Sequence, residues 1–239
     1  MTPFPSTIVK AHGDLTRWQR LHTVRLHARI GGLLWQFKGQ GDFLADTYLT
    51  LDTRTPFVSY EPTGVEWFTS YQPHRVALHQ EDATQEELRD PRSSFEGHLR
   101  ETPWTRLQAV YFASYAMWQY FTTPFLFAGS GFETDDAGSW QEGGEGGRRL
   151  SVTFPPGFPT HCRTQTFYVD SNNLIRRHDY QADIAGGGKV AHYLDDYVEV
   201  DGFRFATKRR AYRRQDDGTS LLSDPPLVSI DLAHISLEN

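Results

Sequence analysis

The chain has 239 residues, of which 38% are hydrophobic and 14% aromatic, with 20 glycines and 13 prolines. This composition excludes a disordered chain and favours one β-rich domain that spans residues 1–239. The formal net charge of -6 argues against a dedicated nucleic-acid binder, and the single cysteine, Cys162, excludes a disulfide framework or a thiol cluster for zinc.

The N-terminal segment lacks the features of an export signal. Residues 2–9 contain two prolines, no positive charge and no apolar run of the required length. We therefore expect a cytoplasmic protein. The pattern of the first residues predicts a short helix over residues 6–20.

Residues 23–80 are expected to form the strands of the front half. Segments rich in β-branched and aromatic residues predict strands near 23–35, 43–52, 57–61, 65–70 and 75–80. The charged and polar residues that follow predict a loop over residues 81–98.

A central stretch without charges is the most unusual part of the chain. Twenty-six consecutive residues, Leu107 to Phe132, carry no charge and include nine aromatic side chains. Apolar residues recur there at steps of three and four, which predicts a central helix over residues 104–121. Val110 and Tyr120 widen its apolar face, so we expect this helix to be surrounded by protein.

The ends of this helix are also suggested by the sequence. Thr102 before Pro103 predicts an N-cap with proline at the first helical position, and Pro124 ends the pattern. Because polar residues interrupt the stretch, no membrane span is expected.

The last third of the chain predicts an antiparallel meander over residues 163–237. Five strands are expected, near 163–170, 174–184, 189–200, 203–213 and 227–237. Turn residues separate them, and Asp201-Gly202 is the strongest hairpin pattern among these breaks. The glycine-dense segment Gly143 to Gly147 predicts a flexible hairpin loop.

Together these elements predict a mainly β fold with few helices. A curved antiparallel sheet of about nine to eleven strands has to bury one face, and an uncharged aromatic helix fits the hollow of such a half-barrel.

Two segments resemble the bacterial lipoprotein localisation factors of the LolA/LolB-like group. One is Ala11-His12-Gly13 with Trp18, running into the strand at Thr23. The other is the strand Tyr197 to Gly202 before Phe203. The resemblance implies an open half-barrel whose apolar hollow holds acyl chains or another hydrophobic ligand, and it supplies no catalytic residues. The chain departs from this group because it shows no export signal and no acylated cysteine near its start. Lipoprotein transport across a periplasm is therefore not expected, and the chain would be an intracellular relative with another ligand.

Alternation along the strand from residue 174 indicates which side chains face the hollow. Leu174, Arg176, His178 and Tyr180 share one face. The other face is expected to be solvated, and it carries Arg177, Asp179, Gln181 and Asp183. On the next strand the inward face is ambiguous. If His192 points inward, it approaches His178 across the hairpin.

These residues allow an enzymatic hypothesis. A neutral imidazole of His178 or His192 beside the carboxylate of Asp196 is a competent general base near neutral pH. Tyr180 or Arg176 would then stabilise an oxyanion. This alternative is a cofactor-independent isomerase, cyclase or hydrolase. The hypothesis of a metal ion held by His178, His192 and Asp196 is weaker, because no compact ligand spacing supports it. The structural interpretation is that these amphipathic side chains satisfy one another's hydrogen-bonding groups on a partly buried sheet.

The leading hypothesis is a binding protein for a hydrophobic small molecule or lipid, without cofactor or metal. Such pockets are mostly apolar with a few polar groups, which His178, Tyr180 and Arg176 would supply. The expected pocket walls are Trp104, Tyr111, Tyr115, Trp118, Phe121, Phe125 and Phe127. A purely structural role, in which the helix fills the barrel, remains the third possibility.

A basic run occupies the strand from Arg204 to Arg214. Its six arginines and lysines predict a solvated edge strand protected by charge. The alternative is docking to an acidic partner or to lipid head groups. Nucleic acid is not expected, because no aromatic platform accompanies the run.

Overall fold

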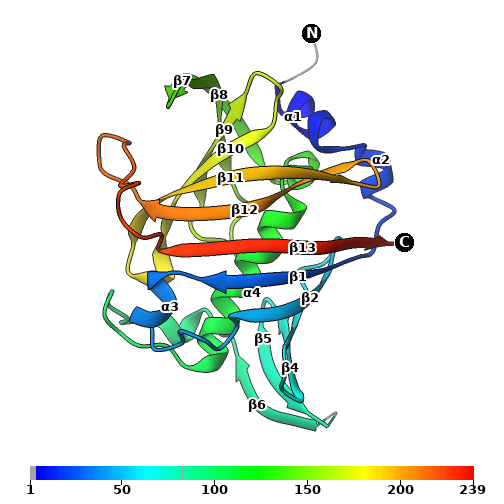
Figure 1. Ribbon diagram of the computed structural model, residues 1–239, viewed down its shortest axis with the longest axis vertical. Helices are drawn as coiled ribbons and strands as arrows, with labels where there is room; N and C mark the ends of the chain where they lie inside the picture. The colour runs from blue at the N-terminus through cyan, green and yellow to red at the C-terminus, as the bar shows by residue number, and fades with distance from the viewer. Residues whose placement is uncertain (1–3, 82) are drawn as a thin grey trace.

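The computed structural model describes residues 4–81 and 83–239, and the strands of this part of the chain form a single antiparallel sheet (Figure 1). In chain order the strands are β1 (Thr23–Gly31), β2 (Asp46–Asp52), β3 (Val58–Pro62), β4 (Trp67–Gln72), β5 (Arg75–Gln80), β6 (Ala83–Arg89), β7 (Glu133–Glu142), β8 (Glu145–Thr153), β9 (Thr164–Asp170), β10 (Ile175–Ala182), β11 (Gly188–Val200), β12 (Phe203–Arg213) and β13 (Val228–Glu238). The sheet is curved and does not close, which confirms the expected half-barrel.

The sheet is assembled outward from its centre, where the first and last strands meet. Its order is β6-β5-β4-β3-β2-β1-β13-β12-β11-β10-β9-β8-β7. Strand β1 pairs with β13 through Val24 opposite Leu237 and Ile30 opposite Ile230. The two edges are therefore β6 and β7, both from the middle of the chain.

The helices of the described residues are few and lie on one side or at the ends of the sheet. They are α1 (Phe4–His12), α2 (Leu15–Trp18), α3 (Leu33–Phe37) and α4 (Arg106–Thr122), with 3-10 turns at Ser93–Phe95, Phe125–Ala128 and Asp183–Ala185. None of them is long and apolar enough to cross a membrane.

Helix α4 is the central helix expected from the sequence, and it connects the two edges of the sheet across the hollow (Figure 1). All sixteen residues from Leu107 to Thr122 are buried. Aromatic contacts fix it on both sides: Tyr111 lies 5.9 Å from Tyr71 of β4, and Phe121 lies 5.6 Å from Phe205 of β12, between ring centroids. The helix is surrounded because apolar side chains project from it in every direction.

The N-cap of the helix is Thr105, three residues after the predicted cap. The side chain of Thr105 accepts a hydrogen bond from the backbone of Gln108, and the Gln108 side chain accepts one from the Thr105 backbone. This capping box satisfies two free donors of the first turn. Thr102, the cap predicted from the sequence, instead accepts a hydrogen bond from the backbone of Leu99 in the preceding loop.

Three strands were not predicted: β6, β7 and β8. The segment 81–98, expected to be a loop, contains β6. The hairpin expected at Gly143 to Gly147 is present, with Gly143 and Gly144 in its turn, but its strands β7 and β8 were not predicted. Strands β6 and β7 are mostly exposed and polar, so no hydrophobic alternation reveals them. Polar edge strands are common because they discourage pairing with other chains.

The expected N-terminal helix over 6–20 is broken into α1 and α2 at Gly13. The backbone of Gly13 has φ +153° and lies so close to Phe203 that a Cβ atom would fall 2.3 Å from its ring. Only glycine permits this approach. The break lets Trp18 of α2 stack on Phe125, 4.2 Å between ring centroids.

Candidate functional site

An open cavity of about 560 Å³ lies at one end of the half-barrel, and we call it the mouth cavity. Helix α3 and the loop between β12 and β13 lie at this end (Figure 1). Its apolar floor is formed by Phe112 of α4, Tyr180 of β10, Val190 of β11, Ala211 of β12 and Val228 of β13.

Basic side chains surround the opening of the mouth cavity. Arg100, Lys189, Arg213 and Arg214 line it together with one carboxylate, Glu101. Lys189 is paired with Asp216 at 2.7 Å, and Arg214 lies 3.3 Å from Asp179. Arg100 and Arg213 are exposed and have no ion-pair partner within the described residues. The rim therefore offers uncompensated positive charge above an apolar floor.

Lys38 fixes one wall of the mouth cavity. Its ammonium donates hydrogen bonds to the carbonyl oxygens of Arg100 at 2.7 Å and Thr102 at 3.0 Å. Burial lowers the pKa of Lys38. These bonds hold the loop before α4 against α3. Phe37, the residue before Lys38 and the last of α3, is 62% exposed at the opening, so an apolar side chain faces solvent there.

A buried cluster of histidine and tyrosine side chains lies behind the floor, and Tyr180 links it to the mouth cavity. The Tyr180 ring stacks on His161 at 3.9 Å, and its hydroxyl lies 3.2 Å from that of Tyr120. The ring nitrogens of His161 bond to the hydroxyls of Tyr115 at 3.1 Å and Tyr120 at 2.9 Å. Burial lowers the pKa of His161 to about 3, so the ring is neutral, with one tyrosine donating and the other accepting.

His178 and His192 both face the hollow, as a directly opposed pair of β10 and β11, with ring centroids 6.2 Å apart. Nε2 of His178 donates to Oε1 of Gln165 at 2.6 Å, and Gln119 donates to the same oxygen at 2.7 Å. Burial lowers the pKa values of both histidines well below their usual range. The structure thus brings His178, His192 and Tyr180 together.

Asp196 does not join this cluster. Its backbone is left-handed, with φ 52°, and it interrupts the pairing of β11 with β12 between Asp195 and Tyr197. Its side chain is exposed, whereas that of Tyr197 lines a cavity near His178. Asp196 therefore neither orients an imidazole nor completes a ligand set with His178 and His192. Strict alternation failed here because aspartate tolerates the left-handed conformation.

Arg176 also faces away from the hollow, contrary to the prediction. The register between β9 and β10 shifts between Ile175 and Arg177, so one residue is inserted there and the alternation changes. The guanidinium of Arg176 pairs with Glu145 at 3.5 Å and Asp195 at 3.3 Å. It cannot supply the polar end of a pocket inside the sheet.

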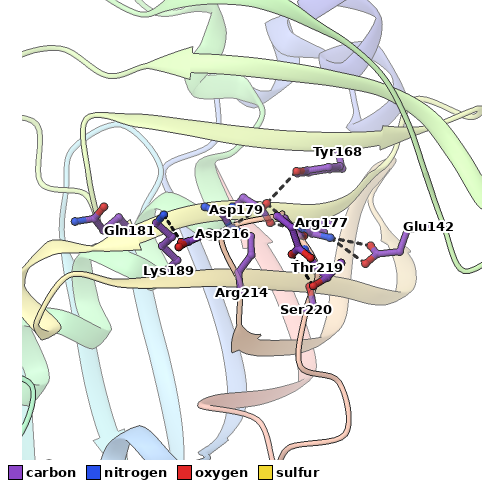
Figure 2. A network of polar contacts seen from close by, with 12 residues as sticks. Glu142, Tyr168, Arg177, Asp179, Gln181, Lys189, Arg214, Asp216, Thr219 and Ser220 are labelled. Carbon is purple, nitrogen blue, oxygen red and sulfur yellow. Dashed lines mark hydrogen bonds and ion pairs between the residues drawn. The ribbon is translucent and has the colours of Figure 1, made fainter.

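The opposite face of β10, predicted to be solvated, carries a buried ion-pair network (Figure 2). Arg177 donates to both carboxylate oxygens of Asp179 at 2.6 and 2.9 Å, and to Glu142 at 3.0 Å. It also donates to the carbonyl of Gly218 at 2.7 Å, and its guanidinium lies 4.6 Å from the ring centre of Tyr168. The network attaches the loop after β12 to the sheet, and this loop leads from the rim residues Arg213 and Arg214.

The seven aromatic residues predicted as pocket walls are all buried in the core: Trp104, Tyr111, Tyr115, Trp118, Phe121, Phe125 and Phe127. None of them lines the mouth cavity, and Phe127 lines a separate groove beside α1. Phe112, on the same helix, was overlooked because a helix that is apolar all round has no single face that marks the cavity.

The basic strand β12 was predicted to be an edge strand, but it lies inside the sheet, between β11 and β13. Arg210 pairs with Asp231 at 2.7 Å, and Arg204 with Glu199 at 3.4 Å. Arg209 is buried, while Arg213 reaches the mouth cavity. The sequence could not distinguish these roles because strand order depends on long-range pairing.

Three solved structures share the fold over nearly the whole chain. A DUF1329 family protein from Desulfovibrio piger is 12% identical, covers 97% of this chain and 90% of its own, and has a TM-score of 0.54. A LolA superfamily protein from Nitrosomonas europaea is 9% identical, with coverages of 98% and 93% and a TM-score of 0.53. A domain from Vibrio parahaemolyticus, assigned to outer membrane lipoprotein sorting, is 7% identical, with coverages of 99% and 91% and a TM-score of 0.53.

These likenesses confirm the LolA-like half-barrel expected from the sequence. At such low identities they show the fold alone. No protein-family model and no curated protein matches the sequence.

We expect stability to fall steeply below pH 6.5, because buried neutral histidines take up protons only after unfolding. Burial lowers the pKa of His12 to about 4 and of His161 to about 3. Between these pKa values and pH 6.5, each such histidine lowers the free energy of unfolding by up to about 1.4 kcal/mol for every unit by which the pH falls. Denaturant unfolding at pH 7, 6 and 5 measures the slope. His161→Gln should reduce it, whereas His74→Gln, whose side chain is 88% exposed, should not. An unchanged slope in His161→Gln would contradict the prediction.

We also expect Arg177→Met to lower the free energy of unfolding by about 3 kcal/mol, because Asp179 is left buried without its closest partner. Arg176→Met is the matched control. Its partners Glu145 and Asp195 are largely exposed, so the loss should stay below about 1 kcal/mol. Urea denaturation of both variants checks this order. Equal losses would show that the network on the outer face is not a major source of stability.

Proposed function

We propose that the protein binds an amphiphilic molecule in the mouth cavity, with an apolar body against the floor and an anionic group at the rim. The observation that carries the proposal is a cavity of about 560 Å³ whose floor is apolar and whose rim is basic. Pockets for small ligands typically measure about 300–1,000 Å³ and combine an apolar lining with a few polar groups.

The floor suits an apolar chain or ring system. Val190 and Ala211 are buried against Tyr180, and partly buried Leu227 and Val228 continue this surface toward the opening. Covering such a surface is favourable by about 25 cal/mol per Å² of apolar area removed from water. Exposed Phe37 at the entrance extends it outside the cavity.

The rim favours an anionic group over a cationic one. Arg100 and Arg213 lack ion-pair partners in the described residues, and Glu101 is the single carboxylate among the lining side chains. Arginine recognises carboxylate and phosphate groups through two parallel hydrogen bonds. The sequence offered the whole basic strand as a candidate surface for lipid head groups. Only the C-terminal end of this strand, at Arg213, remains a candidate for that contact.

The fold supports a hydrophobic ligand as well. One structural neighbour belongs to the LolA superfamily, and another is assigned to lipoprotein sorting. The cytoplasmic setting stays a prediction, which fractionation of the host's cells checks.

The acid-base alternative has less support from the geometry. The cavity beside His178 measures about 20 Å³, enough for about one water molecule. A general base has to reach its substrate within hydrogen-bond distance. The mouth cavity contains Tyr180 but neither His178 nor His192 in its lining, so binding is the better supported function.

We expect Gly188→Trp to block binding of the fluorescent anion 1-anilinonaphthalene-8-sulfonate. Gly188 lines the mouth cavity, shares a strand face with Val190, and a Cβ atom placed on it meets no atom within 4 Å. Affinity should fall at least about tenfold, which corresponds to about 1.4 kcal/mol. Fluorescence titration measures it. The control Val198→Trp adds the same side chain at an exposed position of β11 outside the cavity. Unchanged affinity in Gly188→Trp would place the binding elsewhere.

The charge of the rim generates a separate prediction. Arg213→Gln should weaken binding of this anionic probe about three- to tenfold, because one charge-assisted hydrogen-bond contact is lost. Binding of the neutral probe N-phenyl-1-naphthylamine should change less than twofold. The control Lys208→Gln removes an exposed charge of β12 that does not line the cavity. Equal effects of Arg213→Gln on both probes would refute the assignment of the rim to an anionic group.

A further inference from the structure

Arg209 of β12 is a buried cation without a counter-charge. Its residue surface is 4% exposed, on the face of the sheet that packs against α4. One guanidinium nitrogen, Nη2, donates to the carbonyl oxygen of Tyr120 at 3.4 Å, and Nε has no hydrogen-bond partner. Within residues 4–81 and 83–239, no carboxylate lies within 4.0 Å of it.

The surroundings of Arg209 do not compensate its charge. The guanidinium lies 5.2 Å from the centre of the Tyr120 ring, and such a cation-π contact supplies no full negative charge. The buried histidines near it, His12, His178 and His192, are neutral because burial lowers their pKa values. An unpaired buried ion costs several kcal/mol, and arginine cannot avoid this cost by losing its proton.

A small cavity adjoins Arg209 and contains further polar groups. It measures about 20 Å³, and its lining includes His12, Thr123, His178, Tyr197 and Arg209. The hydroxyl of Thr123 is buried and has no partner in the described residues, so it is a second free donor at this cavity. Arg204 adds a second cation to the lining, and no acidic residue belongs to it.

We propose that this cavity binds one small monovalent anion of the size of chloride, held by the guanidinium of Arg209 and the hydroxyl of Thr123. Its volume admits about one water-sized particle and excludes an acyl chain or an aromatic ring. The anion neutralises the buried charge, so it binds the folded state and stabilises the wall formed by β10, β11 and β12. This site shares no lining residue with the mouth cavity, and it stands or falls independently of the proposed function.

The first test measures melting temperature at constant ionic strength while sodium gluconate is replaced by sodium chloride. Gluconate is too large for the cavity, so the melting temperature should rise by about 4 °C once chloride exceeds its dissociation constant about tenfold. Arg209→Met should abolish this rise. Lys208→Met, which removes an exposed charge of the same strand outside both cavities, should retain it. Equal melting temperatures of the unaltered protein in both salts would overturn the proposal.

The second test does not depend on the stability of a variant. Crystals of the unaltered protein grown in sodium bromide should show an anomalous bromide peak within hydrogen-bond distance of Arg209 and Thr123. A peak there without a halide-dependent melting temperature would identify an adventitious ion only and would overturn the proposal. Absence of a peak, with ordered water at the guanidinium, would overturn it too. Should Arg209→Met fail to fold, Thr123→Val replaces it, with a reduced halide response as the expected result.

Discussion

The burial of α4 inside the curved sheet is the constraint on which the rest of the structure depends. An open antiparallel sheet has one apolar face to cover, and the aromatic helix α4, which is uncharged from Leu107 to Thr122, covers it without bringing a charge into the core. The helix joins the two edge strands, so the chain has to cross the hollow to complete the sheet. Because α4 fills most of this hollow, the space for a ligand lies at one end, where α3 and the loop after β12 form an opening.

The buried polar groups on the two faces of the sheet find their hydrogen-bond and ion-pair partners in different ways. Inside, neutral histidines, tyrosines and glutamines bond to one another, and burial keeps the imidazoles uncharged. Outside, Arg177 and Asp179 form a compact ion pair under a covering loop. Arg209 differs from both groups, because it is charged, inward-facing and unpaired. The small cavity beside Arg209 is therefore the place where we propose that an anion binds.

Local pattern was sufficient for the elements with strong alternation or helical periodicity. The strands of the meander were predicted within two residues of their observed ends, and His178 and Tyr180 were correctly assigned to the inner face. Predictions failed where the backbone departs from regular alternation. The inserted residue at Arg176 and the left-handed Asp196 each turn a side chain away from the hollow. No residue type announces such irregularities, since tertiary pairing stabilises them.

The sequence by itself determined that a charge-free helix must be enclosed by an antiparallel sheet, because hydrophobic burial depends on composition and periodicity. Only the tertiary structure decided where a cavity remains, because volume depends on how Phe112, Tyr180 and Val228 from distant segments meet. It also decided which arginines of one strand are paired, buried or free. These roles follow from the position of β12 in the sheet order, which long-range pairing fixes and local sequence does not encode.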